Sequence, residues 1–405
     1  MLPNFLKTIG KRCPQATRRI VLLPLAILGV FGFLINVHIS FLSSDFGICY
    51  PKTNIVFLKT HKSAGSSIQN ILMRYGDSHN LTFVLPRKGN YLGHPAPFSR
   101  SMVIPPRLPI YNILAHHTRL DYREIRSIMP PNTVFITIIR DPVQIFESSF
   151  AYYRLDKFYG SDLHKFIQLL PNATEDLVNK RYKGKFGANQ MFFDLGGNPD
   201  ASSNQTVVLS YLDQLESWFD LVLVADRMDE SLILLRHLMC WDMDDVVTFK
   251  LNARSPIYKS ELNDEEKSRL RKLNYADVLL YNRFLARFEK QVEAFGSERM
   301  ASETAELRDR TQKWYRFCVK GEQTLSTPRV KPKYYYNPRV MVFEPNNNVT
   351  NGTCNAMTSE ELPFTDKLRK AQMARFSTLY QKFPRRNNKT QSLKILSNYK
   401  NIPKT

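Results

Sequence analysis

The sequence has 405 residues, of which 43% are hydrophobic and 12% aromatic, and its formal net charge is +20. The apolar content suffices for a large buried core and excludes a disordered chain. The charge does not indicate nucleic-acid binding, because it gathers at the two ends, with +5 over Met1–Arg19 and +11 over Lys320–Thr405. We therefore predict no nucleic-acid partner.

The first predicted element is a membrane anchor. An uncharged apolar run begins at Ile20, passes Val37 and extends toward Leu42, and only basic charges precede it. About 20 helical residues span a bilayer core, and a basic flank stays in the cytosol. We predict a cytoplasmic tail (1–19), a transmembrane signal-anchor (20–42) and a short stem (43–53). A cleaved signal peptide is the alternative, but the run is long and a small-residue cleavage site is missing.

Glycosylation acceptors and cysteines agree with a lumenal location for the rest of the chain. Six tripeptides fit the Asn-x-Ser/Thr pattern, at Asn80, Asn172, Asn204, Asn348, Asn351 and Asn388. Cys13 lies on the cytosolic side. The four others, Cys49, Cys240, Cys318 and Cys354, would enter an oxidising compartment, where they allow three disulfide connectivities that the sequence does not distinguish.

The middle of the chain alternates buried strands with amphipathic helices. Such alternation predicts an α/β fold with a central, mostly parallel sheet flanked by helices. The predicted strands are 54–58, 111–115, 134–139 and 221–225, and the predicted helices are 66–75, 122–129, 142–153, 207–218 and 228–238. Residues 260–318 are strongly helical, with a start signal at Asn263. We predict one lumenal domain over 54–325, and a basic, loop-rich extension over 326–405 that packs on it and returns to helix at 363–380.

The segment Phe57–Ile68, F-L-K-T-H-K-S-A-G-S-S-I, leads from an apolar strand through two lysines and a cluster of small residues into a helix. Small residues let backbone N–H groups approach an anion, the helix start adds partial positive charge, and a lysine adds a full one. The segment has one glycine and lacks the G-x-x-x-x-G-K-[ST] pattern, which argues against a P-loop kinase. A strand-turn-helix without a ligand is the alternative interpretation.

A second segment places Arg140 at the exit of a buried strand and Ser148 on a helix that Pro142 opens. Arginine at a strand end can bind a phosphate with two N–H groups, and a serine about two helical turns later can close on the same oxygens. Alone, such a pair would be read as a salt-bridged turn. Together with the first loop, it favours a nucleotide site.

The two segments resemble the 5′-phosphosulfate loop and the 3′-phosphate motif of sulfotransferases that use 3′-phosphoadenosine 5′-phosphosulfate (PAPS). More narrowly, F-L-K-T-H-K, N-I-L-A-H-H-T-R-L, I-I-R-D-P-V-x-x-F-E-S-S-F, D-E-S-L-I-L-L and F-K-L-N-A-R resemble the galactose 3-O-sulfotransferases. The similarity covers about 54–318, with a weaker echo over 354–383. It implies a P-loop-like sulfotransferase fold preceded by one transmembrane helix.

The resemblance also implies residue roles. The donor's 5′-phosphosulfate would lie on Lys59, Lys62 and the backbone of Ser63, Ala64, Gly65, Ser66 and Ser67, and its 3′-phosphate on Arg140 and Ser148. The family often has hydroxyl residues where this chain has Ala64 and Gly65, so a backbone contact would replace a side chain there.

A general base is expected on His117, just past a predicted strand, because open α/β sheets keep their sites at strand ends and the resemblance aligns a histidine there. Lys62 would neutralise charge on the leaving phosphate. His116 stands where relatives often have Asn, which leaves open which ring acts, and His61 is a weaker candidate for the base. Secondary candidates are Arg119, Glu147, Lys250 and Arg254.

We thus predict a Golgi membrane enzyme that transfers a sulfuryl group from PAPS to the 3-OH of a β-galactose on glycoprotein or glycolipid glycans. No metal is expected, because the histidines and cysteines show no ligand spacing. The expected partners are a galactose-terminated acceptor and the Golgi membrane, and a homodimer is left open. The alternatives are a sulfotransferase for another glycan, such as a glycosaminoglycan, and a non-catalytic lumenal glycan-binding protein.

Overall fold

A computed structural model of the protein describes residues 49–103, 110–172, 180–324, 339–346 and 351–382. The predicted tail, the membrane anchor and most of the stem lie outside these ranges. Within them, no helix combines the length and apolar character needed to cross a membrane. The described residues from Pro51 onward belong to one compact unit.

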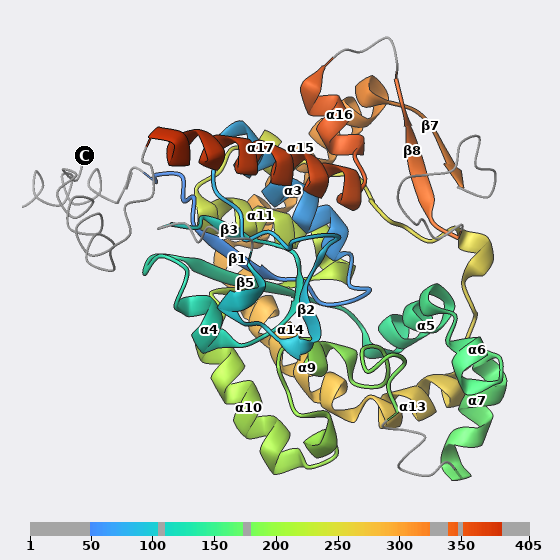
Figure 1. Ribbon diagram of the computed structural model, residues 1–405. Helices are drawn as coiled ribbons and strands as arrows, with labels where there is room; N and C mark the ends of the chain where they lie inside the picture. The colour runs from blue at the N-terminus through green and yellow to red at the C-terminus, as the bar shows by residue number, and fades with distance from the viewer. Residues whose placement is uncertain (1–48, 104–109, 173–179, 325–338, 347–350, 383–405) are drawn as a thin grey trace, which may run out of the picture. The chain divides into compact units, whose positions relative to one another are not determined.

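A four-stranded parallel sheet forms the centre of this unit, in the order β3-β1-β5-β6 (Figure 1). Its strands are β1 (Ile55–Leu58), β3 (Ile113–Leu114), β5 (Val134–Ile139) and β6 (Leu221–Val224). Every strand residue is buried, as expected for parallel strands covered on both faces. The prediction of a parallel α/β sheet, with strands at these four places, is confirmed.

Alternate strand residues enter two separate cores. Ile55 and Phe57 of β1 pack with the helices above the sheet in Figure 1, and Val56 and Leu58 with those below it. The upper helices are α3 (Gly65–Ser78), α11 (Met228–Met239), α12 (Met243–Val246), α15 (Ser297–Cys318), α16 (Gly352–Thr358) and α17 (Glu361–Lys382). The lower helices are α4 (Tyr122–Arg126), α9 (Gln190–Asp194), α10 (Gln205–Trp218) and α14 (Tyr275–Phe295).

A third, smaller core joins the helices beside the sheet. Phe146 and Phe150 of α5 pack there with Phe166 and with Leu270 of α13. These elements are α5 (Pro142–Tyr153), α6 (Leu155–Tyr159), α7 (Leu163–Leu169) and α13 (Asp264–Leu273). Single-turn 3₁₀ helices occupy Arg100–Met102, Leu170–Asn172, Pro199–Ala201, Ala225–Arg227 and Pro256–Tyr258.

Local capping explains why two helix starts were predictable. Asp141 accepts a hydrogen bond from the N–H of Gln144, and Pro142 occupies the first turn of α5, where its missing N–H costs nothing. Asn263 and Glu266 form a reciprocal capping box at the start of α13. Both helices begin where the sequence places them.

A second parallel pair, β2 (Tyr91–Pro97) with β4 (His117–Arg119), was not predicted. The pair is short and irregular, and its register shifts between Leu92 and Pro97, so it leaves no alternating pattern. It matters because Tyr91 lies opposite His117 in the register.

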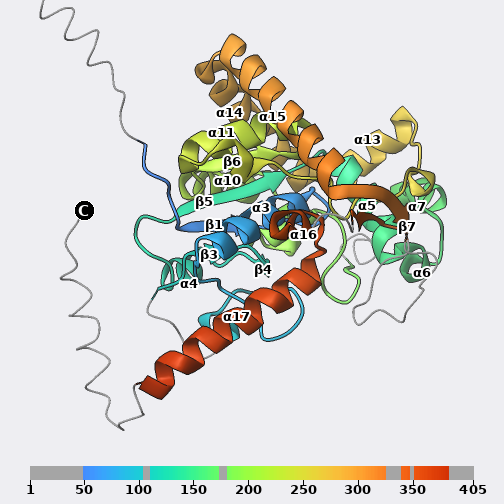
Figure 2. The ribbon, with the colours of Figure 1, turned by 90° about the horizontal axis from the view of Figure 1, so that it is seen from above.

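The C-terminal region holds more structure than the predicted loops. An antiparallel pair of strands, β7 (Val319–Thr324) and β8 (Met341–Pro345), precedes α16, and the predicted return to helix is confirmed by α17. The observed start is Glu361 rather than 363, because Pro363 is tolerated in a first turn. Both α16 and α17 contact α3, and Figure 2 shows α17 running outward from beside α16.

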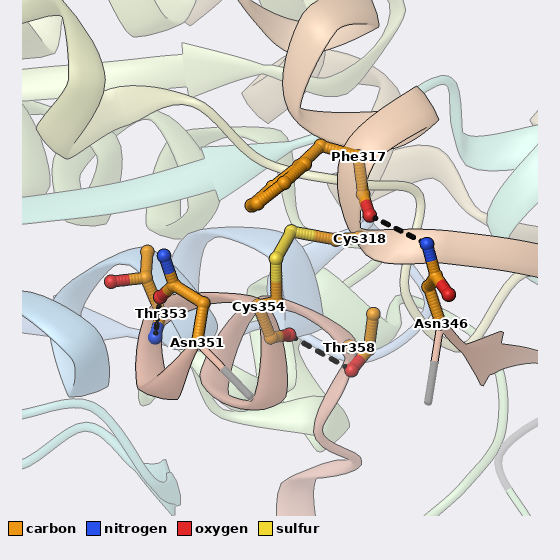
Figure 3. Close-up of a disulfide and its surroundings, with 7 residues drawn as sticks. All are labelled: Phe317, Cys318, Asn346, Asn351, Thr353, Cys354 and Thr358. Atoms are coloured by element: carbon orange, nitrogen blue, oxygen red, sulfur yellow. Dashed lines mark hydrogen bonds between the residues drawn. A yellow bond between two sulfur atoms is a disulfide. The ribbon is translucent and has the colours of Figure 1, made fainter. Parts of the chain in front are cut away.

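A disulfide between Cys318 and Cys354 ties α16 to the end of α15 (Figure 3). Asn346 and Phe317 add a hydrogen bond of 3.3 Å beside it, and the Thr358 hydroxyl donates to the Cys354 carbonyl at 2.9 Å. The bond excludes the two connectivities in which these cysteines have other partners. The glycosylation acceptors within the described ranges, Asn80, Asn172, Asn204 and Asn351, are all exposed.

Removing this disulfide with the double substitution Cys318→Ser and Cys354→Ser should lower the thermal denaturation midpoint. The two cysteines are 36 residues apart, and closing a loop of that length stabilises a fold by about 4 kcal/mol in the chain-entropy model. The measurement is a melt of wild type and variant under identical conditions. Equal midpoints would contradict the prediction.

Candidate active site

A cavity of about 840 Å³ opens at the carboxyl ends of the sheet strands, within the usual volume range of small-molecule sites. Its wall includes the residues that follow β1, β5 and β6. Nine of the ten predicted site residues line it: Lys59, Lys62, Ala64, Gly65, Ser66, Ser67, His117, Arg140 and Ser148. The tenth, Ser63, is fully buried beside it, where its hydroxyl contacts that of Thr60 at 2.6 Å.

The loop between β1 and α3 has the backbone shape of an anion cradle. Lys62 (φ 61°) and Ala64 (φ 63°) both adopt the left-handed conformation, which costs a non-glycine residue about 1 kcal/mol or more. Alternation of this kind turns successive N–H groups to one side and forms an anion-binding nest. The Ser67 hydroxyl instead donates to the Phe249 carbonyl at 2.8 Å. What the loop presents is therefore mainly backbone amide.

Gly65 is required by the chain beneath it. A Cβ atom at this position would lie 2.8 Å from Cγ of Lys59, closer than real contacts allow. The aliphatic part of the Lys59 side chain packs directly against the loop backbone, so a residue with a Cβ atom at position 65 would clash with it.

Lys62 carries the charge of this loop. Its ammonium lies 3.6 Å from the centre of the Tyr152 ring, a cation–π contact, and Arg140 donates to its carbonyl at 3.0 Å. Burial, followed by the charges of Arg254, Arg140 and Lys59, lowers the pKa of Lys62 to about 7. Such a cluster of positive charge is the environment in which an anionic ligand is most stabilised.

Arg254 forms a second cationic group with Arg140 in the same cavity. Glu147, buried on α5, holds one end of the Arg254 guanidinium and also accepts the N–H of Ser260 at 2.8 Å. Within the described residues, Nε and Nη1 of Arg254 are buried and have no hydrogen-bond partner. Buried unpaired donors are costly, so these two N–H groups fit an oxyanion ligand.

The other secondary candidates lie in different settings. Arg119 donates to the carbonyls of Phe193 and Gly197, at 3.2 and 2.9 Å, and so supports the loop after α9. Lys250 is exposed at the cavity wall.

Lys59 lines the cavity, but its ammonium is paired with the protein. It donates to Gln69 at 2.6 Å and to Glu361 of α17 at 2.7 Å. Burial lowers the pKa of Lys59, and the charge and hydrogen bond of Glu361 oppose this shift. Lys59 thus joins the donor loop to the C-terminal helix.

His117 and His61 lie face to face, with ring centres 4.2 Å apart, and the Tyr91 ring stacks on His117 at 4.9 Å. Nδ1 of His117 is buried and has no partner among the described residues, while the ring also hydrogen-bonds to the backbone of Lys59. Burial and the charge of Lys59 hold the pKa of His117 well below its usual value. The ring is therefore neutral, with a nitrogen available to accept a proton.

His116 points elsewhere. It is fully buried, and its Nε2 lies 2.9 Å from the Thr365 hydroxyl on α17. Burial lowers the pKa of His116 to about 3. It does not line the cavity wall described above, so His117 and His61 are the rings positioned to act.

Asp194, at the end of α9, was missed by the sequence analysis. Its carboxylate accepts the backbone N–H of His61 at 2.8 Å, the Gln190 amide at 2.8 Å, and contacts the His61 ring at 2.7 Å and His94 at 3.1 Å. Nε2 of His61 then faces the Tyr91 hydroxyl at 3.1 Å. This arrangement fixes the orientation of the His61 ring, as a carboxylate does in a catalytic triad.

His61, His94 and Asp194 are also close enough to hold a metal ion. They come from three separate segments, so no sequence spacing could have indicated such a group. The oxygens of Asp194 already accept hydrogen bonds from the protein, and burial, which would raise its pKa, is outweighed by His61 and His94, which lower it. We interpret the group as a hydrogen-bonded network.

Replacing Asp194 with asparagine should lower kcat by about 10- to 100-fold, because the His61 ring loses its anchor. The pH profile of kcat should change as well, which a purely structural defect would not cause. The control is Asp277→Asn: this buried carboxylate accepts the N–H groups of Met191 and Phe192 in α9. It should lower the melting temperature more than it lowers kcat. Identical profiles for wild type and Asp194→Asn would refute this role.

The chain is similar in sequence to known sulfotransferases. A family model described as galactose-3-O-sulfotransferase matches residues 14–370. A galactosylceramide sulfotransferase of Bos taurus is 38% identical over 291 residues, covering 70% of this chain and 68% of the relative. The protein of that name from Mus musculus is 39% identical over 289 residues, again covering 70% and 68%. Galactose-3-O-sulfotransferase 2 of Mus musculus is 37% identical over 319 residues, covering 74% and 78%.

Proposed function

Since the chain belongs to the galactose-3-O-sulfotransferase family, we propose that its cavity binds PAPS and transfers the sulfuryl group to the 3-OH of a β-galactose residue. The observation that carries the proposal is the pairing of an amide-rich loop holding Lys62 with the cationic pair Arg140 and Arg254 in one cavity. PAPS carries anionic groups at its two ends, and the cavity offers a cationic cluster for each.

The two ends of the donor are assigned by chemistry. The loop from Lys62 to Ser67 would hold the 5′-phosphosulfate with its backbone N–H groups, as helix starts bind phosphate. Arg140, Ser148 and the two unpartnered N–H groups of Arg254 would hold the 3′-phosphate. The left-handed backbone at Lys62 and Ala64 supports the first assignment. Such strained conformations are unfavourable by themselves and are typical of loops that are shaped to bind a ligand.

The transfer step requires one base and one cation. As the galactose 3-oxygen bonds to sulfur, the bond between sulfur and the bridging phosphate oxygen breaks, and the hydroxyl proton goes to His117. Lys62 neutralises the negative charge that moves onto the leaving phosphate. The products are a galactose 3-sulfate and adenosine 3′,5′-bisphosphate. His61, oriented by Asp194, stacks on His117 and would hold that ring in place for the proton transfer.

We place the enzyme in the Golgi as a single-pass type II membrane protein with its active site in the lumen. The charge pattern around 20–42 supports this topology, and so do the exposed glycosylation acceptors and the Cys318–Cys354 disulfide, which needs an oxidising compartment.

The test is transfer of radiolabelled sulfate from PAPS by the full chain, purified in detergent, to a set of β-galactosides. Each acceptor is paired with its 3-O-methyl and 6-O-methyl derivatives. We expect label in the free and 6-O-methyl forms and none in the 3-O-methyl form. Label that persists in the 3-O-methyl form would contradict the assignment of the 3-OH as the site of transfer. Binding of PAPS without transfer to any galactoside would contradict the assignment of galactose as the acceptor.

A further inference from the structure

Glu361, the first residue of α17, is one of four carboxylates in the wall of a cavity that is also lined by seven Lys and Arg side chains. It borders both the main cavity and a smaller one of about 120 Å³ beside it. Its side chain keeps 17% of its surface exposed, against 3% for its partner Lys59. A carboxylate in the wall of an anion-binding site needs an explanation, because it would repel the donor.

The contacts of Glu361 connect it to the acceptor side of the reaction. One oxygen accepts from Lys59 at 2.7 Å and the other from the Asn90 amide at 3.0 Å. The carbonyl of Asn90 accepts the N–H of His117 at 3.1 Å. The next residue, Tyr91, stacks on His117. Glu361 is thus linked to the proposed base through a single residue.

The charge of Glu361 acts on the donor loop and on the acceptor side. It opposes the fall in the pKa of Lys59 that burial causes, and it adds to burial in raising the pKa of Tyr91. The charges with the largest effects on the pKa of Lys62 are those of Arg254, Arg140, Lys59 and Glu147. Burial would raise the pKa of Glu361 itself, but Lys59 and Asn90 hold it below its usual value, so the group is ionised.

An ionised carboxylate next to an amide is well suited to bind neighbouring sugar hydroxyls. Each carboxylate oxygen can accept more than one hydrogen bond, so Glu361 keeps accepting capacity beyond its two protein partners. The same charge would repel a sulfate or carboxylate on the sugar, and repulsion is a common source of specificity.

We propose that Glu361 and Asn90 form the hydroxyl-binding pair of the acceptor subsite, and that Glu361 excludes acceptors with a negative charge on the reacting sugar. The enzyme therefore takes uncharged terminal galactosides. The inference rests on the proposed function, since it assumes galactose as acceptor, and it makes Glu361 a specificity-determining residue supplied by the last described helix.

The first test needs no variant. The full chain in detergent is assayed with a β-galactoside, its 6-sulfated derivative and the matching galacturonide, all with a free 3-OH, at low and moderate salt. We expect kcat/KM for the uncharged sugar to exceed the others by about tenfold or more, with a smaller margin at higher salt. Equal use of the three would overturn the proposal while leaving the galactose assignment intact, whereas no transfer to any would instead remove the proposed function.

The second test assigns the selectivity to Glu361. Glu361→Gln should reduce the preference for the uncharged sugar by about tenfold while changing the KM for PAPS by less than about threefold. Glu360→Gln, the adjacent carboxylate on the same turn, is the matched control and should leave the preference unchanged. A variant that loses activity equally toward all acceptors, or loses donor binding alone, would show that Glu361 merely supports Lys59.

If Glu361→Gln fails to fold, Asn90→Ala tests the same pair with the ion pair to Lys59 preserved. It should raise the KM for the galactoside about tenfold and leave the KM for PAPS unchanged. An unchanged galactoside KM would refute the subsite.

Discussion

Replacing His117 with glutamine is expected to lower kcat by about 10²- to 10⁴-fold, the usual contribution of a general base. Affinity for the donor product adenosine 3′,5′-bisphosphate should stay close to the wild-type value, because His117 lies on the acceptor side. Transfer rates and calorimetric binding on the same preparations measure the two quantities. An unchanged kcat in this variant would show that His117 is not the general base and would leave His61 as the candidate.

The neighbouring residue provides the control. His116→Asn removes a fully buried imidazole that, within the described residues, hydrogen-bonds to Thr365 on α17, away from the cavity. It should alter stability more than kcat. The pair of variants separates a loss of chemistry from a loss of packing.

The depressed pKa of His117 also predicts a pH profile. Burial and the charge of Lys59 keep the ring neutral as pH falls through 6.5, so the basic form is not lost there. Protonation of His117 should therefore cause no decline in the wild-type kcat/KM for the acceptor near pH 6.5. A decline that is present in wild type and absent from the residual activity of His117→Gln would contradict this.

Replacing Lys62 with methionine should lower kcat by about 10²- to 10³-fold, because a cation aimed at developing charge is lost while the side-chain volume is kept. Donor affinity should fall too. In the free enzyme the pKa of Lys62 is about 7, so the charged form disappears as pH rises above that value. We therefore expect kcat/KM for PAPS to decline above pH 7.

Lys62→Arg tests the cause of that decline. Arginine keeps its charge at every accessible pH, so the alkaline decline should vanish even if the geometry costs some activity. Because the anionic donor stabilises the protonated lysine, binding at pH 7 should also take up a proton, measurable by calorimetry in buffers of different ionisation enthalpy. A decline that persists in Lys62→Arg would assign it to another group.

The donor side of the site was predictable because its signals are local. The loop at Lys62 and the helix carrying Ser148 each follow a buried strand within a few residues, and parallel strands bring their carboxyl ends together. A sequence motif of a dozen residues therefore contains the strand, the loop and the helix start. The same locality made the Asn263 capping box visible.

The acceptor side was not predictable, because distant segments build it. Asp194 reaches His61 across 133 residues, and Glu361 reaches Lys59 across 302. In a sequence, a single aspartate at a helix end or a glutamate at a helix start looks like an ordinary solvent-exposed residue. Only the fold reveals that both carboxylates lie against the donor loop. The irregular β2–β4 pair, which sets Tyr91 beside His117, was hidden for a similar reason.

The same 302-residue separation has a consequence for synthesis. Ribosomes add about 5–20 residues per second, so Lys59 exists for about 15–60 s before Glu361 is made. During that time the donor loop of the nascent chain carries a cation without its partner. The enzyme therefore completes its active site only after α17 has been synthesised, and a chain cut short before α17 would keep the donor motifs yet lack one wall of the site.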